Sequence, residues 1–338
     1  MMRELLKKLC AIPAVSGRED ALRDFIIKEV SPFADCKTDK NGNLICFKKG
    51  RKSPEKKVML DAHMDEVGII AAAFTSDGFV KFTAVGGIDV AVMMGRSVIF
   101  ENGVRGVIGV KPVHLLSAEE KKKLPDKDTL YIDIGATDKA EAERLINLGD
   151  TAVFESEITL LGENKIKARA LDDRAGVAIL ISLLKNDAEY DFYGVFSIAE
   201  EVGCRGAKTA TYAINPDAAI ILESTTAADL HGASEENTVC CLGDGPAVSF
   251  MDGGTLYDRR MFDAVKALGL KMQVKRMVSG SNDSSAIHLT RDGVPTITIS
   301  LPTRYIHSPS SIADLRDFDD MLPLALAMLE KVASGQVV

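Results

Sequence analysis

The sequence predicts an α/β domain that is interrupted by a smaller, mostly β insertion. Helix-like and strand-like segments alternate in residues 1–66 and again in residues 162–338, which is typical of a largely parallel sheet covered by helices on both faces. Residues 67–161 instead contain short β-like runs separated by glycine turns. Apolar residues make up 46% of the 338 residues, so the chain can bury a substantial core. We therefore assign residues 1–66 and 162–338 to one domain and residues 67–161 to an inserted domain.

Two helices and two strands are expected before the insertion. Apolar residues recur at helical spacing over residues 3–12 and 18–30. Ser16 stands three positions before Glu19, and this capping-box spacing predicts the start of the second helix. Two short apolar runs then predict strands, at residues 44–47 and 58–60.

The insertion and the segment after it differ in their patterns. Six short runs in the insertion predict strands: "GIIAAAF", "GFVKFTAV", "RSVIF", "GVRGVIGV", "LYIDIGA" and "DTAVFES". Only residues 139–147 resemble a helix there. After residue 162 we expect helices at 174–185 and 206–213, strands at 193–199 and 218–222, a helix in "MFDAVKALGL", a strand in "TITIS" and a C-terminal helix from Phe318.

Composition excludes several functional classes. The net charge is −8 and no basic block occurs, which argues against nucleic acid or an anionic membrane as a partner. No apolar window reaches the roughly 18 residues of a membrane span, and the first residues lack the apolar region of a secretory signal. The six cysteines form no Cys-x-x-Cys pair, so we expect reduced thiols in a cytoplasmic protein.

Charged and imidazole side chains stand where the predicted strands end. In open α/β sheets, functional sites form at the carboxyl ends of the strands. The residues that fit this position are His63, Asp65, Glu200, Glu201, Glu223 and His307, and Asp172 and Asp173 lie just before a predicted helix. Each has a structural explanation when taken alone: a histidine can be a core residue, adjacent glutamates can form a solvated turn, and the two aspartates can cap the helix.

Together these residues predict a metal site. Carboxylates gathered at one sheet edge repel one another and are costly to bury unless positive charge lies among them. Zinc accepts imidazole nitrogen and carboxylate oxygen, and two metals can share a bridging carboxylate. The spacing places His63 and Asp65 on the same side of an extended chain, so Asp65 can orient the imidazole. Glu200 and Glu201 can face one site only if the chain turns, which Gly203 permits. One of the two glutamates would then bind metal and the other would act as a general base.

Five ordered motifs resemble one known family over nearly the whole chain. "DAHMDEVG", "KARALDDRAG", "IAEEVGCRGA", "GVIGVKPVHLL...LYIDIGA" and "GVPTITISLPTRYIHSP" are similar to those of the tetrahedral aminopeptidases, whose members are also labelled glutamyl or deblocking aminopeptidase, cellulase M or endoglucanase. The resemblance implies a phosphorylase/hydrolase-like three-layer catalytic domain with an inserted PDZ-like domain. It also implies dimers, formed through the insertion, that assemble into a dodecamer.

The resemblance also implies roles for single residues. His63 and Glu223 would bind one metal, Glu201 and His307 the second, and Asp172 would bridge both, with Asp173 as the other candidate for the bridge. Glu200 would be the general base, and Asp65 would support His63. Substrate contacts are expected from the loop and strand residues Gly280, Asn282, Asp283 and Arg304.

Three departures from the family pattern concern the expected site. Glu223 replaces the usual aspartate, so its longer side chain shifts the carboxylate. "GSND" stands in place of the usual Gly-Thr-Asp loop, and His231 stands in place of a proline. An altered or inactive metal site is therefore one alternative to a normal family member.

The function expected from these residues is metal-dependent removal of N-terminal residues from short peptides. Two divalent ions per subunit are expected; zinc, cobalt and manganese all suit the ligands. A deacylase or an inactive assembly subunit is an alternative. A metal-independent endo-1,4-β-glucanase is a weaker one, because a sugar site usually offers aromatic platforms and this chain has no tryptophan.

Overall fold

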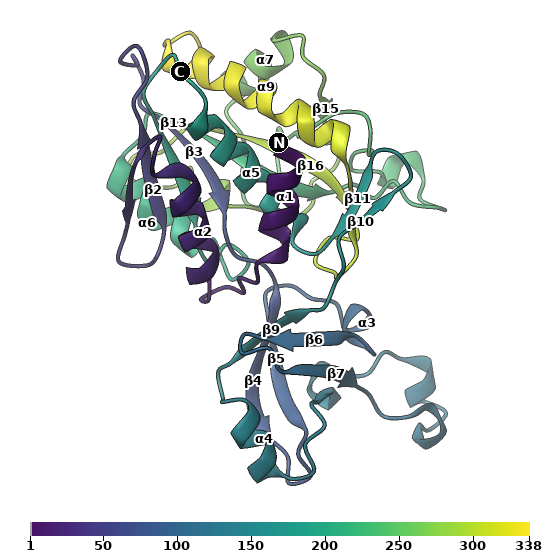
Figure 1. The fold of residues 1–338 in the computed structure, drawn as a ribbon. Coiled ribbons are helices and arrows are strands. Elements are labelled where there is room, and N and C mark those ends of the chain that lie inside the picture. Colours follow the sequence, from purple (N-terminus) through teal and green to yellow (C-terminus); the bar gives the residue numbers. More distant parts are fainter. Residues whose placement is uncertain (1) are drawn as a thin grey trace.

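A large sheet and a separate closed barrel make up the fold of residues 2–338, which the computed structural model describes (Figure 1). The large sheet has the strand order β1-β2-β12-β3-β13-β16-β17-β11-β10, and β14 pairs with both β16 and β15. Its strands are β1 (Asp35–Thr38), β2 (Leu44–Lys48), β3 (Val58–His63), β10 (Thr159–Leu161), β11 (Lys165–Ala168), β12 (Phe192–Ser197), β13 (Ala218–Thr226), β14 (Ala247–Val248), β15 (Gln273–Val274), β16 (Thr296–Arg304) and β17 (Ser311–Asp314).

The four central strands of this sheet are parallel. β12 pairs with β3, β3 with β13, and β13 with β16, all in parallel register. The strands towards both ends are antiparallel, so the prediction of a largely parallel sheet holds only for its centre. Because parallel strands end at the same edge, residues that follow β12, β3, β13 and β16 meet there.

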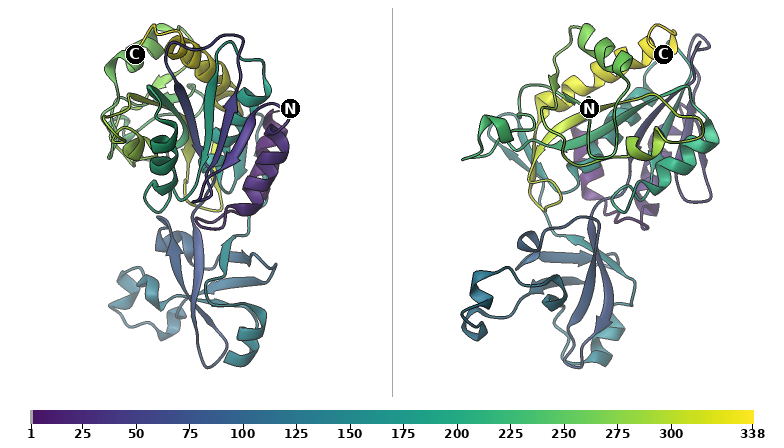
Figure 2. Two further views of the ribbon diagram at one scale, coloured as in Figure 1. Left: turned by 90° about the vertical axis from the view of Figure 1, so that its left-hand side faces the viewer. Right: turned by 180° about the vertical axis from the view of Figure 1, so that it is seen from behind.

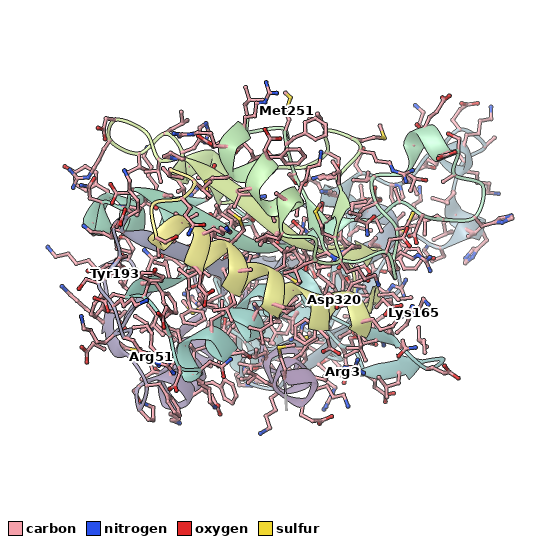
Figure 3. All side chains as sticks on the ribbon, turned by 90° about the horizontal axis from the view of Figure 1, so that it is seen from above. Arg3, Arg51, Lys165, Tyr193, Met251 and Asp320 are labelled. Carbon is pink, nitrogen blue, oxygen red and sulfur yellow. The ribbon has the colours of Figure 1, made fainter. Side chains whose placement is uncertain are left out.

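Helices cover both faces of the large sheet. One face carries α1 (Met2–Ala11), α2 (Asp20–Val30), α5 (Leu171–Lys185), α7 (Arg259–Ala267) and α9 (Leu315–Ala333), and the other carries α6 (Arg205–Ile214) and α8 (Ser284–Ile287) (Figure 2). In β3, Val58 and Leu60 pack on the first face and Met59 on the second, as the alternation of side chains along a strand requires. Lys165 of β11 and Tyr193 of β12 lie on opposite sides of the molecule, towards the two ends of the sheet (Figure 3).

The predicted capping box at the start of α2 is wrong. Helix α2 begins at Asp20, and its N-cap residue Glu19 makes no side-chain cap bond. Ser16 instead donates its hydroxyl to Asp65 Oδ2 at 2.6 Å, and Glu19 accepts from the Ala199 amide at 3.2 Å. These tertiary bonds displace the local cap because both side chains hold the α1–α2 loop against the strand-end loops.

A buried arginine also joins the segments around the strand ends. Arg174 in α5 donates to the carbonyl oxygens of Leu9 and Ile12, at 3.3 and 3.2 Å, and to that of Met64. Its guanidinium also lies 3.1 Å from Glu66 Oε1. The end of α1, the exit from β3 and the start of α5 are therefore held in one network of hydrogen bonds.

The inserted segment folds as a closed barrel with its own apolar core. The barrel order is β4-β5-β8-β7-β6-β9, and all six predicted strands are present: β4 (Gly68–Phe74), β5 (Val80–Val85), β6 (Ser97–Phe100), β7 (Arg105–Gly109), β8 (Tyr131–Asp133) and β9 (Thr151–Phe154). The predicted helix is α4 (Lys139–Leu145), and a short α3 (Val90–Met93) was not predicted. The barrel lies below the large sheet in Figure 1.

The exact domain boundaries stay a prediction. The chain enters the barrel after β3 and leaves it after β9. Residues 159–161, which we assigned to the insertion, form β10 and pair with β11 in the large sheet. Strand pairing therefore favours an insertion that ends before residue 159. Within residues 2–338, no helix is long and apolar enough to cross a bilayer.

Candidate metal centre

His63 ends β3 at the edge where the parallel strands finish. Its imidazole is buried, and Nδ1 lies 3.3 Å from Asp65 Oδ1. The other ring nitrogen, Nε2, lies 3.3 Å from Asp172 Oδ1 and 3.5 Å from Glu223 Oε1. A carboxylate beside Nδ1 favours a proton on that nitrogen, which leaves the lone pair of Nε2 directed at the acidic residues. The structure thus brings together four residues that the sequence singled out.

The adjacent glutamates both face one pocket because the chain bends on either side of them. Ala199 precedes them at φ 54° and Gly203 follows at φ 114°, both in the left-handed region. The amides of Glu200 and Glu201 donate to Asp65 Oδ1 and Oδ2 at 3.0 and 3.1 Å. Asp65 therefore positions both glutamates as well as the imidazole beside it. The sequence predicted the turn at the glycine and missed the one at Ala199.

Asp172 and Asp173 play different structural parts at the start of α5. Both have non-helical backbone angles. Asp173 Oδ1 accepts from the Gly176 amide at 2.8 Å, so the helix-cap interpretation applies to Asp173. Asp172 instead lies between two histidines, with Oδ1 3.3 Å from His63 Nε2 and Oδ2 3.3 Å from His307 Nε2.

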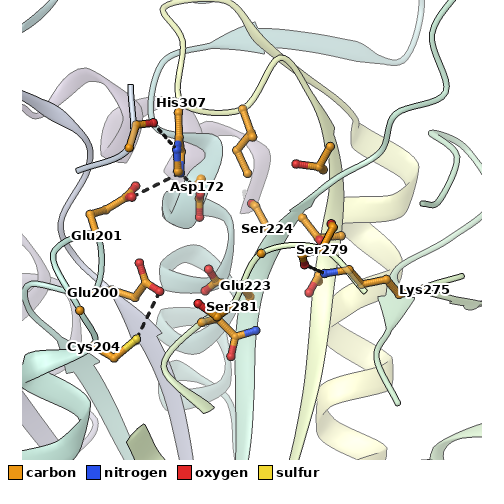
Figure 4. Close-up of a pocket in the computed structure, with 18 residues that line it drawn as sticks. Asp172, Glu200, Glu201, Cys204, Glu223, Ser224, Lys275, Ser279, Ser281 and His307 are labelled. Carbon is orange, nitrogen blue, oxygen red and sulfur yellow. Dashed lines mark hydrogen bonds and ion pairs between the residues drawn. The ribbon is translucent and has the colours of Figure 1, made fainter. Parts of the chain in front are cut away.

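His307 receives its orientation from the barrel. It follows β16 at φ 57°, and its Nδ1 lies 2.8 Å from the carbonyl oxygen of Gly87. A carbonyl only accepts, so Nδ1 carries the proton and Nε2 faces Asp172 and Glu201, each at 3.3 Å (Figure 4). Sequence reasoning missed Gly87, which stands 220 residues from its partner.

The residues group into two trios that suit a divalent cation. Ligand atoms of His63, Asp173 and Glu223 lie within 4.8 Å of one another, and so do those of Asp172, Glu201 and His307. Two buried oxygens, Asp173 Oδ2 and Glu223 Oε2, have no hydrogen-bond partner. Buried carboxylate oxygens without partners are costly, and a cation would satisfy them. Asp173, the other candidate for the bridge, therefore groups with His63 and Glu223 but not with His307.

The protonation of the cluster reflects its crowded negative charge. Burial and the nearby Asp172 carboxylate raise the pKa of Glu201 and the pKa of Glu223 to about 8. Burial would lower the pKa of His307, but its bond to Asp172 and the charge of Glu201 raise that pKa to about 9. Burial also raises the pKa of Glu200 well above its ordinary value. The site therefore attracts positive charge, whether protons or cations.

A pocket of about 350 Å³ opens beside these residues (Figure 4). Gly280 and Asn282, two of the four residues predicted to contact substrate, are part of its lining. Asp283 lies outside the lining, where its Oδ2 accepts from Ser197 at 2.7 Å, and Arg304 pairs instead with Asp229 at 2.6 Å. The structure therefore does not bring Asp283 or Arg304 to the pocket wall.

Other residues of the lining escaped sequence reasoning. His231, which the sequence placed near the site, is exposed and lies outside the lining. Lys275 and Cys204 line the pocket instead. Cys204 could have been noticed within the glutamate motif, whereas Lys275 follows a two-residue strand that carries no clear periodic signal.

The site combines imidazoles and carboxylates at the carboxyl edge of an α/β sheet, beside an open pocket. This arrangement is typical of metal-dependent hydrolases. The family model of M42 glutamyl aminopeptidases matches residues 42–324. A putative aminopeptidase of Acetivibrio thermocellus is 36% identical over 330 residues, with 96% of this chain and 97% of that protein covered. An aminopeptidase of the archaeon Desulfurococcus kamchatkensis superposes with a TM-score of 0.93 at 35% identity, covering 99% and 96% of the two chains.

The chain therefore belongs to the M42 glutamyl aminopeptidase family and is a peptide hydrolase. The resemblance identified in the sequence is confirmed, and with it the mixed α/β fold.

Further relatives differ in the substrates that their names state. A lysyl aminopeptidase of Pyrococcus furiosus is 33% identical, with 97% of both proteins covered, and a glutamyl aminopeptidase of Lactococcus lactis is 30% identical, with 93% and 91% covered. The TET1 peptidase of Pyrococcus horikoshii, described as assembling into a tetrahedron or an octahedral shell, matches with a TM-score of 0.86, 34% identity and 99% of both chains covered. A Thermotoga maritima structure titled endoglucanase matches with a TM-score of 0.79, 33% identity and 98% and 97% covered.

Proposed function

We propose that this protein is a two-metal aminopeptidase that removes N-terminal residues from short peptides. The observation that carries the proposal is the position of Asp172, whose two oxygens each face a different histidine. His63 with Glu223 would hold one ion, and His307 with Glu201 the other. The bound ions would polarise the scissile carbonyl and lower the pKa of an attacking water.

Glu200 is the proposed general base. It lines the pocket, yet it belongs to neither histidine trio. Its carboxylate would accept the proton of the attacking water and then donate it to the leaving amine. Asp65 would act as a positioning residue, because it holds the imidazole of His63 and the amides of both glutamates. The acidic cluster would also attract a free α-amino group, which favours an exopeptidase.

The same proposal includes the protein's metal ions, its oligomeric state and its location in the cell. Two ions per subunit are proposed, with zinc first and cobalt or manganese as alternatives, because nitrogen and oxygen ligands suit all three. The barrel is proposed to act as a PDZ-like dimerisation domain within a homo-oligomer. We propose a dodecamer, the state described for a similar TET1 structure, which matches with a TM-score of 0.84 at 34% identity. A cytoplasmic location is proposed as well.

Metal removal tests the proposed activity. The chain is stripped with a chelator and assayed on free and N-acetylated short peptides, with and without added Zn²⁺, Co²⁺ or Mn²⁺. We expect cleavage of free peptides only, lost on stripping and restored by metal. Cleavage confined to N-acetylated peptides would indicate a deacylase, and no cleavage with metal restored would indicate an altered site. Glucan hydrolysis that survives chelation would support the glucanase alternative, although within residues 2–338 no phenylalanine, tyrosine or tryptophan lines the pocket.

Metal binding should release protons, and the number of protons released should decrease as the pH rises. The pKa of His307 is raised to about 9 and that of Glu223 to about 8, so these groups hold protons near neutral pH. A cation needs their deprotonated forms and must displace those protons. Metal affinity should therefore fall as the pH drops below this range. Calorimetric titration with Mn²⁺ in buffers of different ionisation enthalpy should show about one or more protons released near pH 7 and fewer near pH 9.5. Equal release at both pH values would contradict the expectation.

A further inference from the structure

Two cysteine thiols meet at one end of the large sheet. Cys36 in β1 and Cys46 in β2 stand directly opposite each other in the antiparallel register, and their sulfurs lie 2.8 Å apart in a hydrogen bond. Cys46 is buried in the apolar core, whereas Cys36 is half-buried. Within residues 2–338, no other two cysteine sulfurs share a hydrogen bond. Neither thiol belongs to the metal trios or lines the pocket, so the proposed peptidase function does not use this pair.

The positions of the two cysteines suit a disulfide bond that needs no backbone movement. Opposite residues of antiparallel strands have Cα atoms about 4.5–5.5 Å apart. Disulfide bonds join residues whose Cα atoms lie about 4.4–6.8 Å apart. The register of β1 and β2 therefore already holds Cys36 and Cys46 at a distance that a covalent bond can span.

The two thiols differ in reactivity. Cys36 accepts the hydrogen bond of Cys46, which lowers the pKa of Cys36. The same hydrogen bond, together with burial, raises the pKa of Cys46. The thiolate is the nucleophilic form of cysteine, and exposure decides whether an oxidant can reach it. Cys36 therefore has the features of a thiol that is oxidised first, and Cys46 those of a thiol that then attacks the oxidised sulfur.

We propose that Cys36 and Cys46 form a redox site that hydroperoxides oxidise reversibly to a cross-strand disulfide. The Cys36 thiolate attacks one peroxide oxygen, the O–O bond breaks, and the other oxygen takes a proton and leaves as water or an alcohol. Cys36 is then a sulfenic acid. The Cys46 sulfur attacks the Cys36 sulfur, the S–O bond breaks, and the hydroxyl leaves with the Cys46 proton as water. The thiols are oxidised to the disulfide, and the peroxide is reduced.

The strand that this bond would fasten lies at one end of the sheet. β1 has four residues, three of them exposed, and pairs with β2. A short end strand with little buried surface opens readily, and a covalent link to its neighbour opposes that opening. Hydrogen exchange of the amides of residues 35–38 should therefore be slower after oxidation. Equal exchange before and after the bond forms would contradict this stabilising role.

Oxidation of the metal-restored full chain tests the proposal. The protein is treated with hydrogen peroxide, the remaining thiols are blocked with iodoacetamide, and tryptic peptides are analysed by mass spectrometry without reduction. Trypsin cuts after Lys37 and Lys40, so the disulfide would join the peptide that ends in "FADCK" to the one that contains "NLICFK". We expect this linked pair to form, to disappear after treatment with dithiothreitol, and to leave the chain monomeric on a non-reducing denaturing gel.

Single-cysteine variants separate the two roles. In Cys46→Ser no thiol can attack the sulfenic acid at Cys36, so dimedone, which traps sulfenic acids, should label Cys36. The unmodified protein should carry less of this label, because Cys46 closes the disulfide. In Cys36→Ser the buried Cys46 should stay a free thiol. The linked peptides of the unmodified protein test the bond even where a serine in the core impairs folding.

Cys241→Ser is the matched control. Cys241 is also half-buried, but burial raises its pKa, so peroxide should oxidise Cys36 at least about 10-fold faster than Cys241 in the unmodified protein. The Cys241→Ser protein should form the same linked pair. Three results would overturn the proposal: oxidation of Cys241 with no bond between Cys36 and Cys46, a disulfide between two chains, or a bond that glutathione disulfide forms and peroxide does not.

Discussion

Replacement of Glu200 by glutamine should lower kcat by about 10²–10⁴-fold, the usual contribution of a positioned acid–base group. The amide cannot take the proton of the attacking water, although it fills the same space. Because Glu200 belongs to neither histidine trio, the variant should retain its metal ions. Peptide turnover and metal content, measured on one preparation, separate loss of the base from loss of the cofactor.

Glu119→Gln provides the control for this substitution. Glu119 lies in the inserted segment with a side chain that is 78% exposed, so its variant should keep full activity. A Glu200→Gln protein with near-normal turnover would contradict the role assigned to this glutamate. Inactivity together with lost metal would show that Glu200 is a ligand and that another group acts as the base.

Replacement of Asp172 by asparagine should remove metal as well as activity. The carboxylate faces both histidines, with one oxygen 3.3 Å from each Nε2, whereas an amide offers one weakly coordinating oxygen and a nitrogen donor. We expect kcat/KM to fall by more than about 100-fold, a larger loss than removal of an outer-shell partner causes. Metal content should fall below that of the unmodified protein, as measured by elemental analysis after gel filtration.

Asp173→Asn is the matched variant, one residue along the chain. Its amide oxygen can still accept from the Gly176 amide, so the start of α5 should remain intact. We expect a smaller loss of metal than in Asp172→Asn, because Asp172 faces both histidines, whereas Asp173 groups only with His63 and Glu223. The opposite order of losses would assign the bridging role to Asp173.

Secondary structure and the types of site residue could be predicted from local patterns. The six strands of the barrel follow from short apolar runs between glycine turns, and most helices and strands of the other domain follow from apolar periodicity. Strand ends were less certain. Glu223 was expected just after a strand, whereas β13 continues to Thr226 and holds this glutamate within it. Pairing with β16 continues from Glu223 to Thr226 and extends the strand beyond its apolar run.

By itself, the sequence determined which chemistry the strand ends could carry. His63, Asp65, Glu200 and Glu201 stand close to apolar runs, and parallel strands end at one edge, so their meeting follows from topology. The spacing of His63 and Asp65 also predicted their contact, which the structure places at 3.3 Å.

Only the tertiary structure decided which partners these residues have. Asp172 contacts the histidines, whereas Asp173 accepts a hydrogen bond from the Gly176 amide. Ser16 donates to Asp65 and does not cap a helix, and the carbonyl oxygen of Gly87 orients His307. Arg304 pairs with Asp229, and Lys275 lies in the pocket wall. Periodicity and spacing describe contacts between residues that are near in the chain. His307 and Gly87 are 220 residues apart in the chain. Their contact depends on the order of the strands in the sheet and on the packing of the two domains, because local sequence patterns do not encode contacts between such distant residues.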